Sequence, residues 1–337
     1  MSTMPALPRD RARRWLLLAT ACGVACGHAD HYLAHPREPG PRVATWEKTF
    51  ARGWLVVHVR GAAPREPGTF PAVIVHPEGG KTADDMQPVL WDLAARRYVA
   101  IAADYRRFVG GHYRRNMFAW RSDADSTAIL DIARGLPEVD RSCVGLLGFS
   151  QGGVYSLLIA AHAPEQVGAV VAYYPVTDFP TWLEQEHASP GRRLAFRAIR
   201  SWFRREAGVE SDAQYDRMLR AASPYYAAEA ITAPVLLVHG DRDTSAPLEE
   251  SERMADRLRA LNKPVRLLVV PGGRHIFNFR DPGQAAFAWD ATVAWLDSHL
   301  RPTAAHPRSA CFHPGTPSAI REETQKGAGE WARPPSS

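Results

Sequence analysis

Short apolar segments alternate with segments of helical periodicity along most of this 337-residue chain. Runs such as FPAVIVH (70–76) and PVLLVH (234–239) are too short for typical helices and are apolar almost throughout. That composition is typical of strands buried on both faces of a parallel sheet, whose crossover connections are usually helices. We therefore expect an α/β fold with an open, doubly wound and mostly parallel sheet.

The predicted elements follow one another in a regular order, with a helix after most strands. With 45% hydrophobic residues, the chain can bury a sizeable core, as a large α/β domain requires. We place this domain at residues 42–300. Strands are expected at 53–60, 70–76, 98–103, 142–147, 166–173, 234–239 and 265–270, and helices at 83–97, 126–136, 151–162, 248–261 and 284–300.

One stretch, residues 177–222, interrupts this alternation. It carries Trp182, Phe196 and Trp202 among many charged residues, which indicates two or three helices inserted after the strand at 166–173. Because an insertion there would sit over the carboxyl ends of the strands, we expect a helical cap. The alternative is a longer pair of crossover helices packed against the sheet.

The two ends of the chain differ from this domain. A basic segment, Arg9–Arg14, precedes an apolar run, Trp15–Cys26, in the layout of an export signal. The run is too short to span a bilayer as a helix, so residues 1–29 are predicted to be an export leader of a periplasmic, secreted or lipid-anchored protein. A cytoplasmic location is the alternative, and membrane association is expected only through a lipidated or uncleaved N-terminus. Residues 301–337 are rich in Pro, Ala, Ser and charge, and we expect a disordered tail.

The remaining composition excludes several classes of site. The four cysteines are Cys22, Cys26, Cys143 and Cys311, and we expect no pair of them to bridge two parts of the core. Cys143 lies in a predicted strand and is expected to be a small buried side chain. No cysteine–histidine cluster has metal-ligand spacing, and we expect neither a metal nor an organic cofactor. The formal charge is +5 without a compact basic run interleaved with aromatics, so nucleic acid is not an expected partner.

The sequence GFSQGG places Ser150 between two glycines, after the predicted strand 142–147 and before the predicted helix 151–162. Glycine two residues to either side leaves room for a sharp strand-to-helix turn that holds the serine in a strained, exposed conformation. The alternative is a structural turn of a nucleotide-binding fold, but no glycine-rich phosphate-binding sequence is present. We predict that Ser150 is a nucleophile and that the N–H of Gln151 stabilises an oxyanion.

A serine hydroxyl is a weak nucleophile unless a base takes its proton and an acid orients that base. His275 lies on a glycine-rich loop after the strand at 265–270, and Asp243 lies in a polar turn after the strand at 234–239. We predict His275 as the general base and Asp243 as the acid. A solvated surface position is the alternative for His275. The alternative acid, Asp241, directly follows a glycine and is expected to stabilise its own turn.

These features resemble the α/β-hydrolase superfamily. GFSQGG, HGDRDTSAP and GGRHIF occur in that order after HPEGG, and the order serine, acid, histidine is that of the superfamily. More narrowly, residues 54–300 resemble dienelactone hydrolases and the catalytic domain of prolyl-oligopeptidase-type (S9) serine peptidases. A β-propeller usually precedes the domain in those peptidases, and no segment here is long enough for one. We therefore expect a small esterase-like hydrolase.

The resemblance also locates the second oxyanion donor. The family's His-Gly-x turn corresponds here to the residues from His76 to Gly79. Pro77 has no N–H, so the N–H of Glu78 or Gly79 is the expected donor. A carboxylate at Glu78 would oppose a developing negative charge unless it points away. Dienelactone hydrolases also carry a glutamate near the nucleophile, and the alternative for Glu78 is a solvated turn residue.

Three residues after the strand at 166–173 are expected to bind substrate: Tyr174, Asp178 and Trp182. The aromatic side chains of the cap are expected to form an acyl or alcohol pocket, and packing within the cap is the alternative role for Trp182.

The predicted function is a serine hydrolase that cleaves carboxylic esters through a Ser-His-Asp triad and an acyl-enzyme intermediate. The expected substrate is a small-molecule ester or a short peptide. The alternatives are an S9-like peptidase or acyl-peptide hydrolase and a dienelactone-hydrolase-like enzyme. A non-catalytic binding protein on the same fold is disfavoured because all three triad positions are filled.

Overall fold

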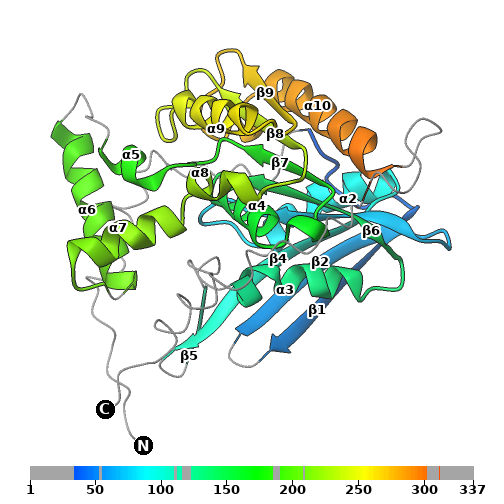
Figure 1. The fold of residues 1–337 in the computed structure, drawn as a ribbon. Helices are drawn as coiled ribbons and strands as arrows, with labels where there is room; N and C mark the ends of the chain where they lie inside the picture. Colours follow the sequence, from blue (N-terminus) through cyan, green and yellow to red (C-terminus); the bar gives the residue numbers. More distant parts are fainter. Residues whose placement is uncertain are drawn as a thin grey trace, which may run out of the picture.

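A single twisted sheet with helices on both faces organises the chain in the computed structural model (Figure 1). This is the doubly wound α/β architecture that the sequence predicts. The predicted leader and, apart from Arg301 and Cys311, the predicted disordered tail lie outside the residues that the structure describes. Those residues are 34–52, 55–109, 112–115, 123–184, 190–207, 209–301 and 311.

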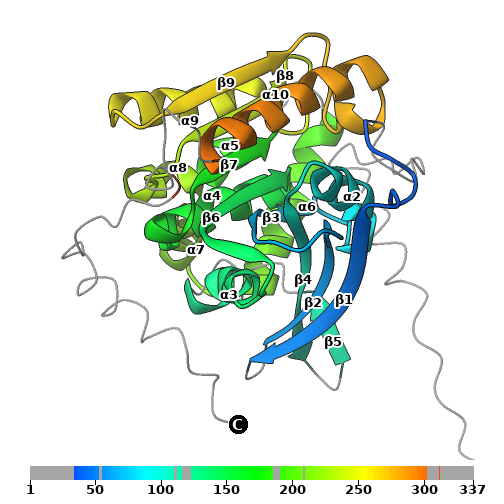
Figure 2. The same ribbon diagram turned by 90° about the vertical axis from the view of Figure 1, so that its right-hand side faces the viewer.

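The described residues form nine strands in the order β1-β2-β4-β3-β6-β7-β8-β9, with β5 paired to β4. The pairs β1–β2, β2–β4 and β4–β5 are antiparallel. The pairs β4–β3, β3–β6, β6–β7, β7–β8 and β8–β9 are parallel. Figure 2 shows β1 and β2 at one end of the sheet and β8 and β9 at the other. The strands are Val43–Arg52 (β1), Leu55–Pro64 (β2), Phe70–His76 (β3), Val99–Val109 (β4), His112–Arg115 (β5), Val139–Phe149 (β6), Ala169–Tyr173 (β7), Val235–Gly240 (β8) and Val265–Val270 (β9).

Helices connect the parallel strands, and short 3₁₀ turns adjoin several of them. No helix in the described part of the chain combines the length and the apolar character needed to cross a membrane. The α-helices are Gln87–Ala95 (α2), Asp123–Arg134 (α3), Gln151–His162 (α4), Phe179–Glu184 (α5), Pro190–Ala207 (α6), Asp212–Ala221 (α7), Pro224–Ala227 (α8), Leu248–Ala260 (α9) and Pro282–Leu300 (α10), and the 3₁₀ turns are Asp84–Met86, Pro164–Gln166, Ala228–Ala230 and Phe277–Phe279.

The sheet separates two hydrophobic cores. Side chains alternate along β3, so that Ile74 packs in the core formed with α3, α4 and α9, whereas Val73 and Val75 pack in the core formed with α2 and α10. This alternation follows from the two-residue period of a strand. Both faces of the central strands are therefore buried, which explains why their sequences are apolar throughout.

The helical insertion predicted at 177–222 consists of α5, α6 and α7, which lie to the left of the sheet in Figure 1. Trp182, Phe196 and Leu219 pack there with Val154 and Leu158 of α4 in a third hydrophobic cluster. The insertion therefore has a small core of its own, and α4 links it to the sheet.

Sequence periodicity does not predict β1 and β5. The predicted strand at 53–60 corresponds to β2, and β1 precedes it as an antiparallel partner in which charged residues interrupt the apolar ones. The ring of Trp46 on β1 packs closely against Gly61 on β2. A Cβ at Gly61 would lie only 2.1 Å from that ring. β5 has four residues, HYRR, which are too few and too polar for a periodic pattern.

Cys143 of β6 and Cys311 form a disulfide bond. The expectation that no cysteine pair bridges the core is therefore wrong. Cys311 is buried, and its Sγ lies 3.4 Å from the carbonyl oxygen of Leu300 at the end of α10. A Cβ on Gly168 would lie 3.0 Å from the carbonyl oxygen of Cys311, so a glycine there makes room for the tail. Sequence patterns could not indicate this contact because the polar residues around Cys311 have no periodicity.

Reduction of this disulfide is expected to lower the free energy of unfolding by about 2–4 kcal/mol, because the bond closes a long loop in the unfolded chain. The sequence separation of the two cysteines is 168. The measurement is denaturant unfolding with and without a phosphine reductant. Cys311→Ala serves as the control, since the reductant should not change its midpoint. A wild-type midpoint that is insensitive to reduction would contradict the prediction.

Candidate active site

Ser150 occupies a one-residue turn between β6 and α4. Its backbone torsions, φ 49° and ψ −113°, lie in a region that residues with a side chain rarely adopt, at a cost of about 1–3 kcal/mol. The N–H of Ser150 donates to the carbonyl oxygen of Tyr173 on β7 at 2.9 Å. This bond ties the strained turn to the neighbouring strand.

Gly148 and Gly152 permit this turn because backbone atoms crowd both positions. A Cβ on Gly148 would lie 2.0 Å from the carbonyl oxygen of Gly152, and a Cβ on Gly152 would lie 2.1 Å from the carbonyl oxygen of His76. Backbone atoms cannot swing aside as a flexible side chain can, so a larger residue would displace the turn or the loop. The loop after β3 is thereby held against the start of α4, beside Ser150.

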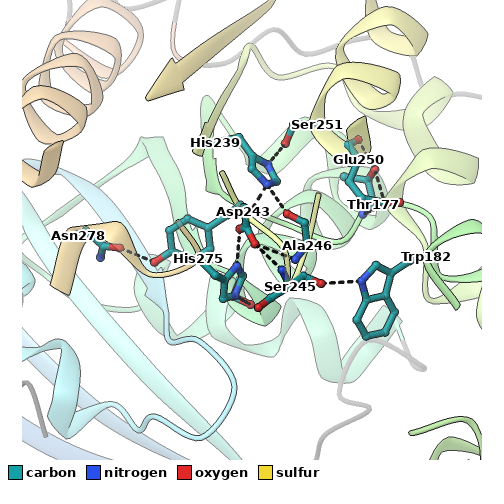
Figure 3. Close-up of polar contacts among 12 residues, drawn as sticks. Thr177, Trp182, His239, Asp243, Ser245, Ala246, Glu250, Ser251, His275 and Asn278 are labelled. Carbon is teal, nitrogen blue, oxygen red and sulfur yellow. Dashed lines mark hydrogen bonds and ion pairs between the residues drawn. The ribbon is translucent and has the colours of Figure 1, made fainter. Parts of the chain in front are cut away.

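His275 connects Ser150 to Asp243, and Figure 3 shows His275 next to Asp243. Its Nδ1 lies 2.6 Å from Oδ2 of Asp243, and its Nε2 lies 3.1 Å from Oγ of Ser150. An ionised carboxylate can only accept hydrogen bonds, so Nδ1 is the donor, and Nε2 of the neutral ring accepts from the serine hydroxyl. The three residues predicted as a triad are thus hydrogen-bonded to one another in the order that general-base activation of a serine requires.

Asp243 is a buried carboxylate with several donors. Its Oδ1 accepts from the N–H groups of Ser245 and Ala246 at 2.8 and 3.0 Å. Burial alone would raise the pKa of Asp243, but hydrogen bonds from His239 and His275, together with their charges, outweigh burial and lower that pKa well below its usual range. Asp243 therefore keeps its negative charge beside His275.

Asp241 bonds across to another loop. Its Oδ1 accepts from the N–H of Gly272 at 2.7 Å, which corrects the expectation that it stabilises its own turn. Gly272 precedes His275 by three residues, and its φ of 70° suits a glycine. Asp241 therefore holds the loop of His275 close to the loop of Asp243.

Tyr174 does not line an open pocket, contrary to its predicted role in substrate binding. Its side chain has an exposed fraction of 0%, and its hydroxyl donates to Oδ1 of Asn278 at 2.6 Å. Its ring centroid lies 4.8 Å from that of His275. Tyr174 therefore packs beside the imidazole and has no surface left for a substrate.

Burial also argues against the predicted substrate contact of Asp178. Its exposed fraction is 1%, and its carboxylate accepts from Thr181 Oγ1 at 2.8 Å, from the Tyr226 hydroxyl at 3.2 Å and from Arg253 at 2.5 Å. Groups of the chain itself thus surround the carboxylate, and they anchor the start of the cap to α8 and α9.

Trp182 joins the cap to the loop of Asp243. Its Nε1 donates to the carbonyl oxygen of Ser245 at 2.8 Å (Figure 3), and its ring packs against Phe196 of α6 at a centroid distance of 4.9 Å. The packing role that the sequence left open for Trp182 therefore has clear partners. Its contact with substrate stays a prediction.

The predicted oxyanion donors lie on two segments that meet beside Ser150. Gln151 begins α4, and a Cβ on Gly79 would lie 3.5 Å from its side-chain oxygen. The carbonyl oxygen of Glu78 accepts from the N–H of Lys81 at 3.1 Å, which closes a turn around Gly79. The roles of the N–H groups of Gln151, Glu78 and Gly79 in binding an oxyanion stay predictions.

Glu78 is buried, with an exposed fraction of 7%, so it is not the solvated turn residue of the alternative interpretation. Burial raises its pKa to about 8, and the charges of Lys81 and Arg280 lower it only in part. The side chain is therefore mostly protonated at neutral pH. A neutral carboxyl removes the electrostatic conflict with an oxyanion that the sequence suggested.

Sequence reasoning gave no role to the side chains of His76, His239 or Glu250. His76 is buried at the end of β3, where burial lowers its pKa to about 3 and Ser156 is its hydrogen-bond partner. Glu250 accepts from the N–H groups of Thr177 and Asp178, each at 2.9 Å. For the two histidines, the available signal was a polar residue in an otherwise apolar run, as in FPAVIVH and VLLVHG, since such a residue needs a buried partner. Among the described residues, no group of three or more His, Cys, Asp or Glu side chains could hold a metal ion.

The buried carboxyl of Glu78 predicts a pH-dependent contribution to stability. Its folded-state pKa of about 8 exceeds the ordinary 4.5, so the unfolded chain loses this proton first as pH rises. The contribution is complete below pH 4.5 and decreases up to pH 8, with a limiting slope of about 1.4 kcal/mol per pH unit. The melting temperature of Glu78→Gln should therefore rise relative to wild type between pH 5 and 8.

Melting curves at several pH values test this prediction. Glu249→Gln, which alters an exposed carboxyl on α9, is the matched control for the loss of one negative charge. A difference between Glu78→Gln and wild type that stays constant with pH would show that Glu78 is ionised throughout this range.

Comparison with known proteins supports the same fold and chemistry. The model of the prolyl oligopeptidase family matches residues 92–303. The uncharacterized peptidase YtmA of Bacillus subtilis is 26% identical over 64% of this chain and 80% of its own length. Esterase LipC of Mycobacterium tuberculosis is 28% identical over 72% of this chain and 61% of its own length.

Two solved structures are similar in fold. The acylaminoacyl peptidase of Pyrococcus horikoshii has a TM-score of 0.61 and 19% identity, and the match covers 78% of this chain but only 42% of that peptidase. A putative dienelactone hydrolase from Klebsiella pneumoniae has a TM-score of 0.53 and 22% identity, with 75% and 98% of the two chains covered. The resemblance to peptidases and to dienelactone hydrolases noted from the sequence is thus confirmed at the level of the fold.

Proposed function

Because the chain belongs to the prolyl oligopeptidase family of α/β-hydrolase enzymes, we propose that it cleaves carboxylic esters through an acyl-enzyme intermediate. The observation that carries the proposal is the pair of hydrogen bonds that runs from Asp243 through His275 to Ser150. The substrate is a small-molecule ester, and a short peptide is the alternative.

The reaction has two halves. Ser150 Oγ forms a bond to the ester carbonyl carbon while His275 Nε2 takes the hydroxyl proton, and the carbonyl oxygen becomes an oxyanion. Collapse of this intermediate breaks the carbon–oxygen bond of the ester, and Nε2 gives the proton to the leaving alkoxide. Water then attacks the acyl-enzyme with the same proton transfers, which releases the acid and restores Ser150.

Asp243 holds the imidazole in the tautomer that presents Nε2 to Ser150, and it stabilises the positive charge that the ring gains. The N–H of Gln151 at the start of α4 and an N–H of Glu78 or Gly79 bind the oxyanion. The positive end of the helix dipole favours negative charge at that position.

Peptide hydrolysis is the second candidate. It is supported by the similarity to YtmA and to the acylaminoacyl peptidase, whereas esterase LipC supports ester hydrolysis. An S9-like peptidase or acyl-peptide hydrolase would use the same triad on an amide, and a dienelactone-hydrolase-like enzyme would use it on a cyclic ester. We favour esters because they are the more reactive carbonyl substrates.

A fluorophosphonate probe is expected to label wild-type protein at Ser150, and Ser150→Ala is expected to abolish labelling. The wild type should hydrolyse p-nitrophenyl esters with kcat/KM about 10³-fold or more above Ser150→Ala, in keeping with the loss of a nucleophile. It should hydrolyse aminoacyl p-nitroanilides more slowly than esters of similar size. Mass spectrometry of the labelled peptide and initial-rate kinetics provide the measurements.

Two outcomes would contradict parts of this proposal. Labelling that persists in Ser150→Ala would exclude Ser150 as the nucleophile. Faster hydrolysis of anilides than of esters would leave the triad in place and assign the enzyme to the peptidase alternative.

We also propose that the protein is exported. The basic and apolar segments within residues 1–29 have the layout of an export signal, and the bond between Cys143 and Cys311 is of the kind that persists in oxidising compartments. Protein purified from expressing cells is expected to begin within or just after residues 1–29. N-terminal sequencing measures this, and a mature chain that begins at Met1 or Ser2 would contradict export.

A further inference from the structure

A second histidine, His239, lies behind Asp243 on the side away from His275 (Figure 3). It belongs to β8, and its side chain has an exposed fraction of 0%. Its Nε2 lies 2.7 Å from the carbonyl oxygen of Ala246 and 3.5 Å from Oδ2 of Asp243, and its Nδ1 lies 2.7 Å from Oγ of Ser251 on α9. The mechanism above does not use this side chain.

The carbonyl partner of His239 fixes the hydrogen on Nε2. A carbonyl oxygen can only accept, so Nε2 carries the proton that bonds to Ala246. The same N–H faces Oδ2 of Asp243 at longer range. The hydroxyl of Ser251 donates to Nδ1 of the neutral ring and would accept from a charged ring, so this partner suits either state.

Ala246 connects His239 to Asp243 by a second route. Its N–H donates to Oδ1 of Asp243, while its carbonyl oxygen accepts from His239. His239 therefore contacts both the carboxylate and the backbone that binds the carboxylate. A rotation of Asp243 away from His275 would have to break this arrangement, because Oδ1 and Oδ2 are held from different sides.

We propose that His239 is a positioning residue for Asp243, one that keeps Oδ2 aimed at Nδ1 of His275. It acts on Ser150 only through Asp243 and His275, since its own contacts are with Ala246, Ser251 and Asp243. The inference rests on the proposed serine hydrolase function and extends it by one residue.

A purely structural role makes a different prediction. If His239 only filled the core and satisfied Ala246 and Ser251, its loss would reduce stability, and any effect on rate would be independent of Asp243. A positioning role makes the two residues dependent on each other, because an absent carboxylate cannot be misplaced. A double-mutant cycle between His239 and Asp243 separates the two roles.

The experiment compares His239→Leu in the wild-type and Asp243→Asn backgrounds. In the wild-type background, kcat for a p-nitrophenyl ester should fall about 10–100-fold with KM changed less than about twofold, as expected for misplaced catalytic groups. In the Asp243→Asn background, the same substitution should change the rate of fluorophosphonate labelling by less than about twofold. The double-mutant cycle is calculated from labelling rates in both backgrounds, because the Asp243→Asn variant is expected to hydrolyse esters too slowly for a reliable kcat.

Two further variants keep the test independent of folding. His239→Gln places an amide N–H near the position of Nε2 and should restore kcat to within about 10-fold of wild type, as a conservative replacement of a positioning group would. Ser251→Ala leaves the imidazole in place without its Nδ1 partner and should lower kcat about 2–10-fold, since it removes only one of the two bonds that orient the ring.

Tyr98→Phe is the matched control. Its hydroxyl donates to Oδ1 of Asp297 on α10 at 2.7 Å, so the variant loses one partly buried side-chain hydrogen bond at a residue outside the triad. It should lower the melting temperature and leave kcat unchanged in the wild-type background.

The outcomes separate the inference from the proposed function. Wild-type protein that is labelled at Ser150, with His239→Leu and His239→Gln both at wild-type kcat, would overturn the inference and leave the function intact. Equal rate losses from His239→Leu with and without Asp243 would show an independent structural role and would also overturn it. A wild-type protein that is not labelled at Ser150 would overturn both.

Discussion

The one-residue turn at Ser150 sets the arrangement of the site. β6 ends at the residue before Ser150, and α4 begins at the residue after it. Ser150 therefore adopts neither the strand nor the helix conformation. Gly148 and Gly152 approach backbone atoms so closely that side chains there would collide with them. The strained torsions persist because β6 and α4 are fixed by the surrounding cores, and the N–H bond to Tyr173 holds the turn itself. The hydroxyl is consequently presented at the carboxyl edge of the sheet, where the other strand ends can reach it.

The parallel order of β6, β7, β8 and β9 then determines which residues meet Ser150. The loops after β8 and β9 carry Asp243 and His275, and several hydrogen bonds join them, including one from the N–H of Arg242 to the carbonyl oxygen of Gly273. Asp243 bonds to His275, and Asp241 bonds to the backbone of Gly272. The bond of Asp241 orients the loop and the bond of Asp243 orients the imidazole, so the position of His275 does not depend on a single contact. The loop of Asp243 is held by hydrogen bonds from His239 to Ala246, from Trp182 to Ser245, and from the N–H of Ser245 to Asp243.

Local sequence patterns predict the parts of this structure that local forces determine. The helix at 151–162 and the strand at 265–270 have the predicted bounds. Both are mostly apolar segments, and most of the helix and part of the strand are buried. The hydrogen-bonded contact among Ser150, Asp243 and His275 could be predicted because each residue follows a strand of the parallel sheet. Tyr174 was misjudged since its position after β7 indicates a site, whereas its positive φ and its bond to Asn278 turn the side chain inward. The contact between Cys143 and Cys311 depends on packing across the whole domain, which no local pattern encodes.

Burial has opposite consequences for the ionisable groups around Ser150, and hydrogen bonding decides between them. Glu78 and His76 lose their charges because burial penalises the charged form. Asp243 is buried as well, yet two histidines and two backbone N–H groups keep it ionised. The charge near His275 is thus concentrated on one carboxylate, in the place where it can stabilise a protonated imidazole. A buried carboxylate with several donors is costly to rotate, since rotation would leave those donors unsatisfied. The donors that keep Asp243 charged therefore also keep it aligned.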